Sequence, residues 1–536
     1  MVSVFPPPSL SALQIVGVFA ALLLAVITAP LLRTARRKLR IVRAIAPIPG
    51  PTGVPLLGML PALLRNLPRI YHFHEELTKQ FGGGRIKLPV TLFTDGLIYL
   101  TDPADIEHIL STNFGNYVKS QHFIDSAGST FGRSLFGLNH AHCADGGAMF
   151  VLQRKVAAKV FTAANFRRFS AQVFGRYARE AADSIAQRSR GAVCDMSVLS
   201  GQYTMQSIFD IACGVPLRDV DPSLGRGFSD AMAFVVRDSV DRILLKPYFK
   251  YLAWCLPSEY RRRRCEATID ALADSLLAAR LRECDKALAG RADILSLFIR
   301  KARELGGAAG AAVLHPPTLR SIFLTFVIAG WDTTASAITY TFYELARHPA
   351  AQQQVVAELR EHQVGADADD DVISYDGLKQ LRYLDAVVSE AMRLHPTVPA
   401  NIKVAAADDY LPDGTFVPAG VELLYNTFYM GRNSPVWGDD PLAFRPERWL
   451  AMKTRPSAYA FPVFQAGPRA CPGRAMALLE TKLFVATLLS RYAVRLLPDD
   501  ACAQAAGGDR DYVFSATMVM KDGLPLQFTP RAASAF

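Results

Sequence analysis

The chain has 536 residues, of which 50% are hydrophobic and 20% are charged, so it can bury a large core and is not an intrinsically disordered protein. Its formal net charge of +10 is concentrated at one end, because residues 1–74 contain eight basic residues and no acidic one. The remaining chain carries only +2, which excludes the extended basic surface of a nucleic-acid-binding protein.

The first 32 residues carry no charge, and residues 10–32 are apolar enough and long enough to cross a hydrocarbon core of about 30 Å as a helix. A cleaved signal peptide carries its positive charge before the apolar run, but here the basic cluster follows it. We therefore interpret residues 1–32 as an uncleaved membrane anchor, with the following domain on the cytosolic side and the basic cluster suited to an anionic lipid surface. That cluster consists of Arg33, Arg36, Arg37, Lys38, Arg40 and Arg43.

A basic and proline-rich linker, residues 33–58, is expected to join the anchor to one large domain, residues 59–536. No further transmembrane candidate and no internal repeat is evident in that domain.

Within the domain, residues 84–103 alternate in polarity around an Asp-Gly turn and predict a β-hairpin. Residues 150–300 predict several helices. A Gly/Ala-rich stretch, residues 306–312, predicts a loose link before a long helix over residues 316–347. The segment 512–528 predicts a second hairpin with an Asp-Gly turn. We therefore expect a mainly α protein with small β-sheets.

The long helix over residues 316–347 has an unusual interior, because its only charged residue from 321 to 343 is Asp332. A lone carboxyl on an apolar helix is hydrogen-bonded, neutralised or functional. Gly330 removes side-chain bulk where a flat ligand could approach, and Thr333 can bind the carbonyl four residues back. Two interpretations stay open from these residues: a proton relay beside a bound group, or a helix kink with a capped polar patch.

A group of charges is predicted around the helix that ends at His395-Pro396. Glu390 and Arg393 are three residues apart and can pair on one helix face. Arg448, in the loop segment FRPERW, can join them. An isolated pair of this spacing is usually a surface ion pair, whereas three charges in one network indicate a structural role.

The eight cysteines are scattered without a CxxC pair, and a cytosolic domain argues against disulfides. Cys471 stands apart because it lies in FQAGPRACPG, residues 464–473. A zinc site needs three or four ligands, which this spacing does not supply. A nucleophile needs a histidine base, and no histidine follows His395, although one could approach in space. A single thiolate also suits a haem iron, with glycines giving amides access to the sulfur and Arg469 pairing with a propionate.

In their order along the chain, AGWDTT, EAMR, FRPERW and FQAGPRACPG resemble the cytochrome P450 family, and the last segment matches the signature FxxGxRxCxG at every fixed position. The resemblance runs from about residue 47 to the C-terminus. It implies the cytochrome P450 fold, with one catalytic domain behind a single transmembrane helix, and haem b with Cys471 as the iron ligand.

The resemblance also implies roles for other residues. Asp332 and Thr333 would deliver protons during oxygen activation, and Glu390, Arg393 and Arg448 would form a structural network. The cofactor-binding positions that it implies are Cys471, Phe464, Arg469, Gly473, Arg154, Phe150, Lys403 and Gly330.

Three positions depart from the family pattern. Phe150 stands where tryptophan is usual, four residues before Arg154, and lacks the indole N–H donor. Lys403 stands where arginine is common and lacks its planar fork. Pro472 follows the ligand and has no N–H to donate to sulfur, so a more electron-rich thiolate is expected.

FQAGPR, AGWDTT and the QRK stretch look most like the branch of the family that hydroxylates fatty acids and alkanes. The resemblance implies a monooxygenase that inserts one atom of O2 into a C–H bond, with electrons from NADPH through a cytochrome P450 reductase at the endoplasmic reticulum membrane. Alternatives are oxidation of a terpenoid, sterol or xenobiotic, or a haem-thiolate isomerase or dehydratase, which would be expected to lack the acid–alcohol pair at 332–333. The family's layout implies an apolar substrate pocket lined by Phe123, Phe326, Val327, Val398 and Met518.

Overall fold

The computed structural model describes residues 12–54, 56–91, 95–162, 164–188, 193–225, 227–244, 249–362, 375–498 and 510–531. Most of these residues are helical and the strands are short, so the predicted class, mainly α with small sheets, is confirmed. The predicted membrane anchor begins before the described part: residues 1–11 and the side chains of residues 12–27 lie outside it.

The helices before the long central one cover the N-terminal half of the chain. They are α1 (Ala12–Ile45), α2 (Leu60–Arg65), α3 (Ile70–Gln80), α4 (Pro103–Glu107), α5 (Gln121–Phe131), α6 (Ala148–Thr162), α7 (Ala164–Ala186), α8 (Met196–Cys213), α9 (Pro222–Gly225), α10 (Phe228–Leu244), α11 (Phe249–Leu252), α12 (Pro257–Leu281), α13 (Asp285–Ala289), α14 (Ile294–Leu305) and α15 (Gly307–Leu314).

The central helix and those that follow it carry most of the charged and polar groups singled out in the sequence. They are α16 (Pro316–Arg347), α17 (Pro349–Glu361), α18 (Tyr375–Gln380), α19 (Arg382–Leu394), α20 (Thr427–Met430), α21 (Ser434–Trp437), α22 (Glu447–Ala451) and α23 (Arg474–Arg491). The long helix predicted over residues 316–347 is thus confirmed as α16.

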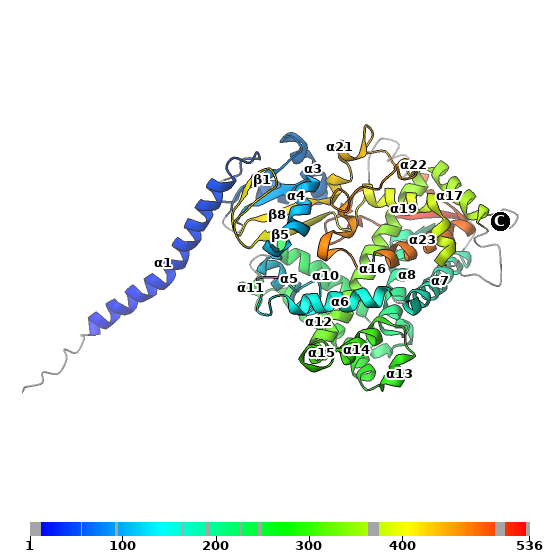
Figure 1. The fold of residues 1–536 in the computed structure, drawn as a ribbon, viewed down its shortest axis with the longest axis horizontal. Coiled ribbons are helices and arrows are strands. Elements are labelled where there is room, and N and C mark those ends of the chain that lie inside the picture. Colours follow the sequence, from blue (N-terminus) through cyan, green and yellow to red (C-terminus); the bar gives the residue numbers. More distant parts are fainter. Residues whose placement is uncertain are drawn as a thin grey trace, which may run out of the picture.

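The largest sheet has the strand order β1-β2-β8-β5-β3, in which only the β2–β8 pair is parallel. It lies at one end of the molecule with α3 and α4, and most of the other elements are helices (Figure 1). Its strands are β1 (Ile86–Leu88), β2 (Leu97–Leu100), β3 (Tyr117–Val118), β5 (Ala400–Ala405) and β8 (Glu422–Asn426). Because β1 and β2 pair antiparallel, the hairpin predicted over residues 84–103 is confirmed.

Three smaller sheets lie elsewhere. Their orders are β4-β12-β9, β10-β11 and β6-β7. The strands are β4 (Val193–Asp195), β6 (Asp409–Tyr410), β7 (Phe416–Val417), β9 (Tyr492–Leu496), β10 (Tyr512–Val513), β11 (Val519–Met520) and β12 (Pro525–Pro530).

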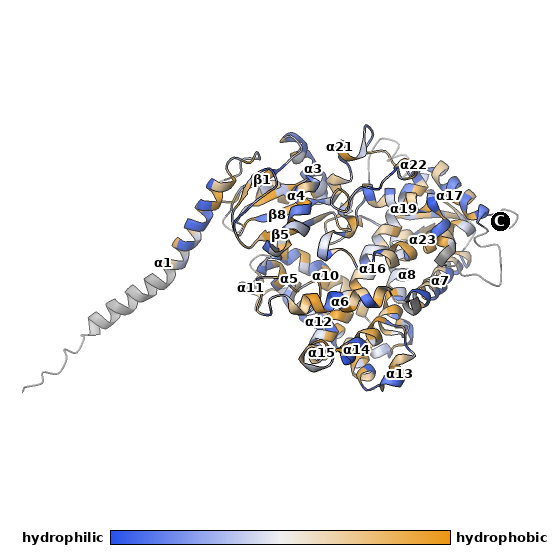
Figure 2. Cartoon of the chain, viewed as in Figure 1, coloured by the Kyte–Doolittle hydropathy of each residue, from blue (hydrophilic) through white to orange (hydrophobic). Residues whose placement is uncertain are grey.

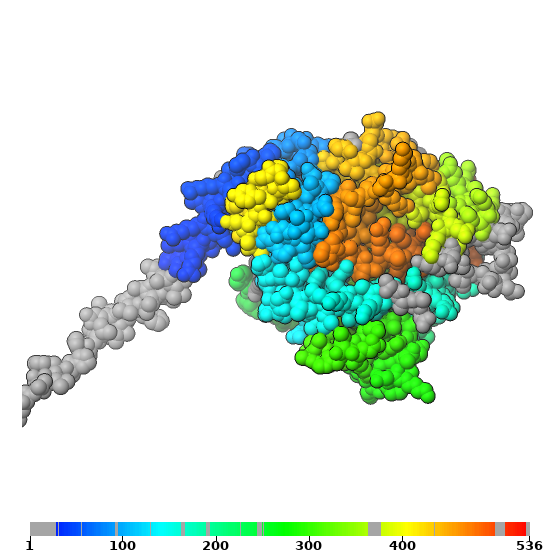
Figure 3. Space-filling view, in the orientation of Figure 1, coloured from blue at the N-terminus to red at the C-terminus, as the bar shows by residue number. Residues whose placement is uncertain are grey.

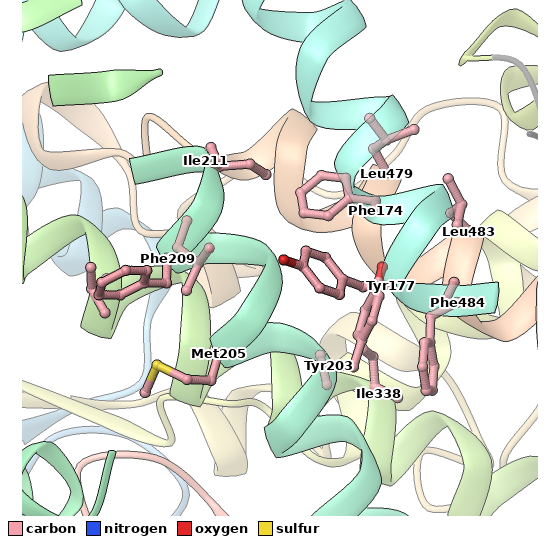
Figure 4. Close-up of a cluster of buried hydrophobic side chains, with 14 of the residues drawn as sticks. Phe174, Tyr177, Tyr203, Met205, Phe209, Ile211, Ile338, Leu479, Leu483 and Phe484 are labelled. Carbon is pink, nitrogen blue, oxygen red and sulfur yellow. The ribbon is translucent and has the colours of Figure 1, made fainter. Parts of the chain in front are cut away.

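The helix α16 forms the centre of the helical core, where it packs against α8, α19 and α23. Among the described residues it is the helix long and apolar enough to cross a membrane, but 72% of its most apolar window is buried inside the protein. Its apolar sequence therefore serves the core. Figure 4 shows part of this core, with Phe174 from α7, Tyr203 from α8, Ile338 from α16 and Phe484 from α23.

The helix α1 extends away from the body, and its inner end carries hydrophilic and hydrophobic residues side by side (Figures 1 and 2). The helix continues through the first part of the predicted linker, to Ile45. Ile41 and Ile45 are buried against the largest sheet, and Arg37 and Arg40 pair with carboxylates of the body. The basic segment therefore attaches α1 to the body, next to the sheet in the space-filling view (Figure 3).

Two predictions about local structure were wrong. The stretch 306–312 is not a loose link: Gly306, with φ +60°, ends α14, and α15 follows at once. Gly310 allows α15 to approach α14, because a Cβ there would lie 2.3 Å from the Ala302 carbonyl oxygen. In the C-terminal segment, β11 pairs with β10 rather than with β12, so the chain changes sheets at the Asp522-Gly523 turn.

Glu390, Arg393 and Arg448 form one fully buried network. The Glu390 carboxylate accepts bonds from Arg393 Nε and Nη2 at 2.7 Å and from Arg448 Nε at 2.8 Å. The Trp449 indole N–H and the Arg445 amide N–H complete its coordination at 2.8 and 2.9 Å. A buried carboxylate with five donors is stable as an anion, so the network ties α19 to α22 and the loop before it.

Replacing Glu390 by glutamine is expected to reduce the free energy of unfolding by roughly 3–5 kcal/mol, because two buried guanidinium groups lose their counter-charge. The control is Glu76→Gln, since the Arg69–Glu76 pair is about half exposed, with relative side-chain exposures of 51% and 56%. Its loss should stay under about 1 kcal/mol. The midpoint of urea unfolding measures both, and similar shifts in the two variants would contradict a structural role for the network.

Candidate active site

Cys471 lies in a tight loop between the turn η6 (Gly467–Arg469) and α23. Its amide N–H donates to the Phe464 carbonyl at 2.8 Å, which closes the loop. Gly467 has φ +60°, and a Cβ there would lie 2.1 Å from the Leu110 carbonyl oxygen. Only glycine fits at that position, so the loop packs closely against the helical turn η2 (His108–Thr112), which contains Leu110.

The thiol of Cys471 is accessible to solvent, yet desolvation by the surrounding protein raises its pKa. The Gly473 amide N–H and the charges of Arg154 and Arg474 act in the opposite direction and favour the thiolate. Pro472 contributes no such donor, because it has no N–H. Cys471 is therefore an exposed residue whose thiol is desolvated by its neighbours.

Four cations lie around this loop: Lys119 before α5, Arg154 on α6, Lys403 on β5 and Arg469 in η6. Lys119 Nζ and Arg469 Nη1 converge on the Leu135 carbonyl oxygen, each at 3.4 Å. These contacts are long for N–H···O bonds, so both groups retain most of their capacity to donate elsewhere.

Arg469 is held from several sides. Its Nη2 donates to the Leu138 carbonyl at 2.9 Å and to His140 Nδ1 at 3.0 Å. Its guanidinium carbon lies 4.4 Å from the centre of the Phe150 ring, so Phe150 stabilises the positive charge by a cation–π interaction. The buried Nε of Arg469 has no partner among the described residues.

Among the described residues, the four cations have no carboxylate as a counter-charge. Burial, reinforced by Arg469, lowers the pKa of Lys403 to about 7. Burial and then Arg469 and Lys403 lower the pKa of Lys119 well below its usual value. In the described part of the chain, no carboxylate forms an ion pair with Lys119, Arg154, Lys403 or Arg469. Like charges that are partly or fully desolvated and have no anion beside them are unfavourable, so the cluster is suited to an anionic ligand.

The acid and the alcohol of α16 make different contacts. Thr333 Oγ1 donates to the Ala329 carbonyl at 2.6 Å, as predicted for a threonine within a helix. Asp332 Oδ2 accepts a bond from Thr517 Oγ1 at 2.5 Å. Burial raises the pKa of Asp332, and the Thr517 bond opposes that rise. Among the described residues, the Asp332 carboxylate on the central helix therefore has no cationic partner and is stabilised by one hydroxyl, that of Thr517.

Comparison with known proteins identifies the family of this chain. Residues 48–507 match the family model described as Cytochrome P450. The chain belongs to the cytochrome P450 family. As a member, it is a monooxygenase, and the family implies a haem cofactor.

Individual P450 relatives are similar along most of their length. Cytochrome P450 704B1 of Arabidopsis thaliana is 30% identical over 84% of this chain and 90% of its own. Cytochrome P450 94A1 of Vicia sativa is 28% identical over 90% of both chains. Cytochrome P450 86B1 of Arabidopsis thaliana is 29% identical over 90% of this chain and 86% of its own.

The residues of this P450 chain fit haem b. The cofactor carries two propionates. The cations around Arg469, whose buried Nε has no hydrogen-bond partner among the described residues, can bind such anionic groups. Cys471 supplies one accessible thiol beside them, as a haem ligand requires. Lys119 and His140 belong to this cluster but were not predicted, because each lies far from residues 464–473 in sequence and only the fold brings them there.

Gly330 was predicted to leave room for the cofactor, but the structure places it against α8. A Cβ at Gly330 would lie 2.5 Å from Ile208 Cγ1, so the missing side chain permits two core helices to approach each other. Steric demand from this neighbouring helix is enough to explain the glycine, and the predicted place of Gly330 beside the cofactor stays a prediction.

The five predicted pocket positions differ in burial. Phe123 and Val398 are half-buried. Phe326 instead packs between Phe161 and Phe298, with ring centres 5.6 and 5.4 Å away, and Val327 is fully buried in the core. Met518 is buried, and its amide N–H bonds to the Thr397 carbonyl, one residue before Val398.

Haem affinity is expected to fall as the pH rises above about 7, because Lys403 then loses its charge in the haem-free chain. A bound propionate raises the pKa of Lys403, so binding takes up a proton between the two values and is favoured on the acidic side. Haem titration of the apoprotein on either side of pH 7 measures this. Lys403→Arg should flatten the dependence, whereas Lys521→Met, at an exposed lysine, should leave it unchanged. A steep dependence retained in Lys403→Arg would contradict the assignment.

Proposed function

We propose that this P450 hydroxylates a fatty acid or a related lipid at or near the end of its chain. The haem-thiolate chemistry is supported above all by one observation: the exposed Cys471 stands beside partly or fully buried cations that have no carboxylate partner among the described residues. The substrate class is supported by the resemblance of FQAGPR, AGWDTT and QRK to fatty-acid hydroxylases, and by the apolar, half-buried Phe123 and Val398.

Haem b, when bound, supplies the iron at which dioxygen is reduced. Cys471 would hold that iron through its thiolate, which Gly473 N–H stabilises and Pro472 does not. Lys119, Lys403 and Arg469 would hold the propionates. Phe150 keeps Arg469 in place by stacking, although it lacks the N–H donor that tryptophan would offer.

Insertion of one atom of O2 into a C–H bond, with release of the other as water, consumes two electrons and two protons. Burial raises the pKa of Asp332, so its carboxyl gives up and recovers a proton closer to neutral pH than an exposed aspartate does. The Thr333 hydroxyl donates to Ala329, and its lone pairs stay available to accept a bond. These two groups would hold and pass the protons that the reaction consumes.

We further infer that the electrons come from NADPH through a cytochrome P450 reductase, and that the protein is a single-pass protein of the endoplasmic reticulum membrane with its body in the cytosol. The uncharged first 32 residues and the basic residues after them support this orientation. The attachment of Ile41 and Ile45 to the body holds the domain close to the end of α1.

In the reduced, carbon-monoxide-bound holoenzyme, the Soret band is expected at the position typical of a thiolate ligand and should be lost in Cys471→Ala. Cys255→Ala, at another exposed cysteine, is the control and should keep the band. A histidine-type spectrum in the unmodified protein would contradict ligation by Cys471.

Titration of the ferric holoenzyme with saturated fatty acids from lauric to stearic acid is expected to shift the haem from low to high spin, because the fatty acid would displace water from the predicted apolar pocket. Val398→Phe, which would narrow that pocket, should weaken the apparent affinity. A shift with a sterol or terpenoid and none with any fatty acid would contradict the proposed substrate and leave the family assignment intact.

A further inference from the structure

The Thr517 hydroxyl is the one hydrogen-bond partner of Asp332 among the described residues, at 2.5 Å from Oδ2. No lysine, arginine or histidine in that part of the chain pairs with Asp332. Its carboxylate is thus held by a neutral donor, and Oδ1 accepts no bond from the described residues. Such a carboxyl keeps one oxygen fixed and the other available for proton exchange.

Thr517 does not reach Asp332 by chance, because the turn that carries it is fixed on both sides. Thr517 is 4% exposed and lies in the turn between β10 and β11. Its neighbour Met518 accepts a bond from Ser336 Oγ at 2.7 Å and donates its amide N–H to the Thr397 carbonyl at 2.9 Å. The hairpin is therefore clamped between α16 and the segment after α19.

Asp332 and Ser336 are four residues apart and lie on one face of α16. Both bind the same turn, one through the Thr517 side chain and one through the Met518 backbone. The hairpin begins at Tyr512, whose hydroxyl accepts the Tyr71 amide N–H at 2.9 Å, so the turn is also attached to α3. This arrangement sets the position of the Thr517 hydroxyl independently of Asp332.

We propose that Thr517 is a positioning residue for proton delivery. Its hydroxyl orients the Asp332 carboxyl and stabilises the ionised carboxylate, which can accept a proton. The proposal rests on the proposed role of Asp332 in the monooxygenase reaction. In this role Thr517 acts through Asp332, to which its hydroxyl donates. Because the hydroxyl donates to the ionised carboxylate, its removal leaves the raising effect of burial on the pKa of Asp332 unopposed.

The experiment uses the full-length holoenzyme reconstituted with a cytochrome P450 reductase. Product and hydrogen peroxide are measured per NADPH across pH for the wild type, Thr517→Val and Thr517→Ser. Thr517→Val is expected to move the midpoint of coupling upward by roughly one pH unit, since a bond to a charged group is lost. Thr517→Ser restores the hydroxyl and should restore the midpoint.

Ser336→Ala is the matched control, because it removes a bond from the same turn without touching Asp332. A purely structural role for the turn would make Ser336→Ala and Thr517→Val behave alike, and that result would overturn the proposal. If Thr517→Val incorporates too little haem, Thr517→Ala removes the same hydroxyl and takes its place.

A second measurement does not depend on turnover. Infrared titration of the resting holoenzyme follows the carbonyl band of protonated Asp332, assigned by its absence in Asp332→Asn. The band should persist to higher pH in Thr517→Val than in the wild type, and an unchanged titration would overturn the proposal. The two hypotheses fail differently: normal coupling in Asp332→Asn refutes the proton relay itself, whereas impaired coupling there with no shift in Thr517→Val refutes only the role of Thr517.

Discussion

The need to balance buried charge is the constraint on which the site depends. In the Glu390 network every charge has a partner, because one carboxylate accepts bonds from Arg393, Arg448 and two further donors. Around Cys471 the opposite holds, since the buried Lys403 and the half-buried Arg469 have no carboxylate partner in the described residues. The same physical rule thus marks one cluster as structural and the other as a place for an anionic cofactor.

The helix α16 belongs both to the hydrophobic core and to the candidate active site. Most of its residues are apolar and buried, which makes it a rigid centre for the neighbouring helices. Gly330 belongs to this structural part, because it permits contact with Ile208. Asp332 and Thr333 interrupt the apolar pattern within the next turn, so their side chains are held by a helix that cannot shift without disturbing the core.

Local sequence rules worked where neighbours in sequence supplied the relevant forces. The long helix α16 has proline at its start and His-Pro at its end, and α19, which carries Glu390 and Arg393, also ends at a His-Pro pair. The rules failed where distant segments supplied them. The Gly/Ala-rich stretch is helical because it packs against α14, and the Asp522-Gly523 turn sends β12 to a different sheet because β9 and β4 provide its partners.

The sequence by itself determined the family and the mainly helical class, and it predicts Cys471 as the haem ligand and Asp332–Thr333 as the proton relay, because each of these rests on residues adjacent along the chain. Only the tertiary structure decided which residues surround them. Lys119 and His140 meet Arg469, and Thr517 meets Asp332, across more than a hundred residues of intervening chain. Hydrogen bonds and charges act over a few ångströms in space whatever the separation in sequence, and such partners become visible only when the chain is folded.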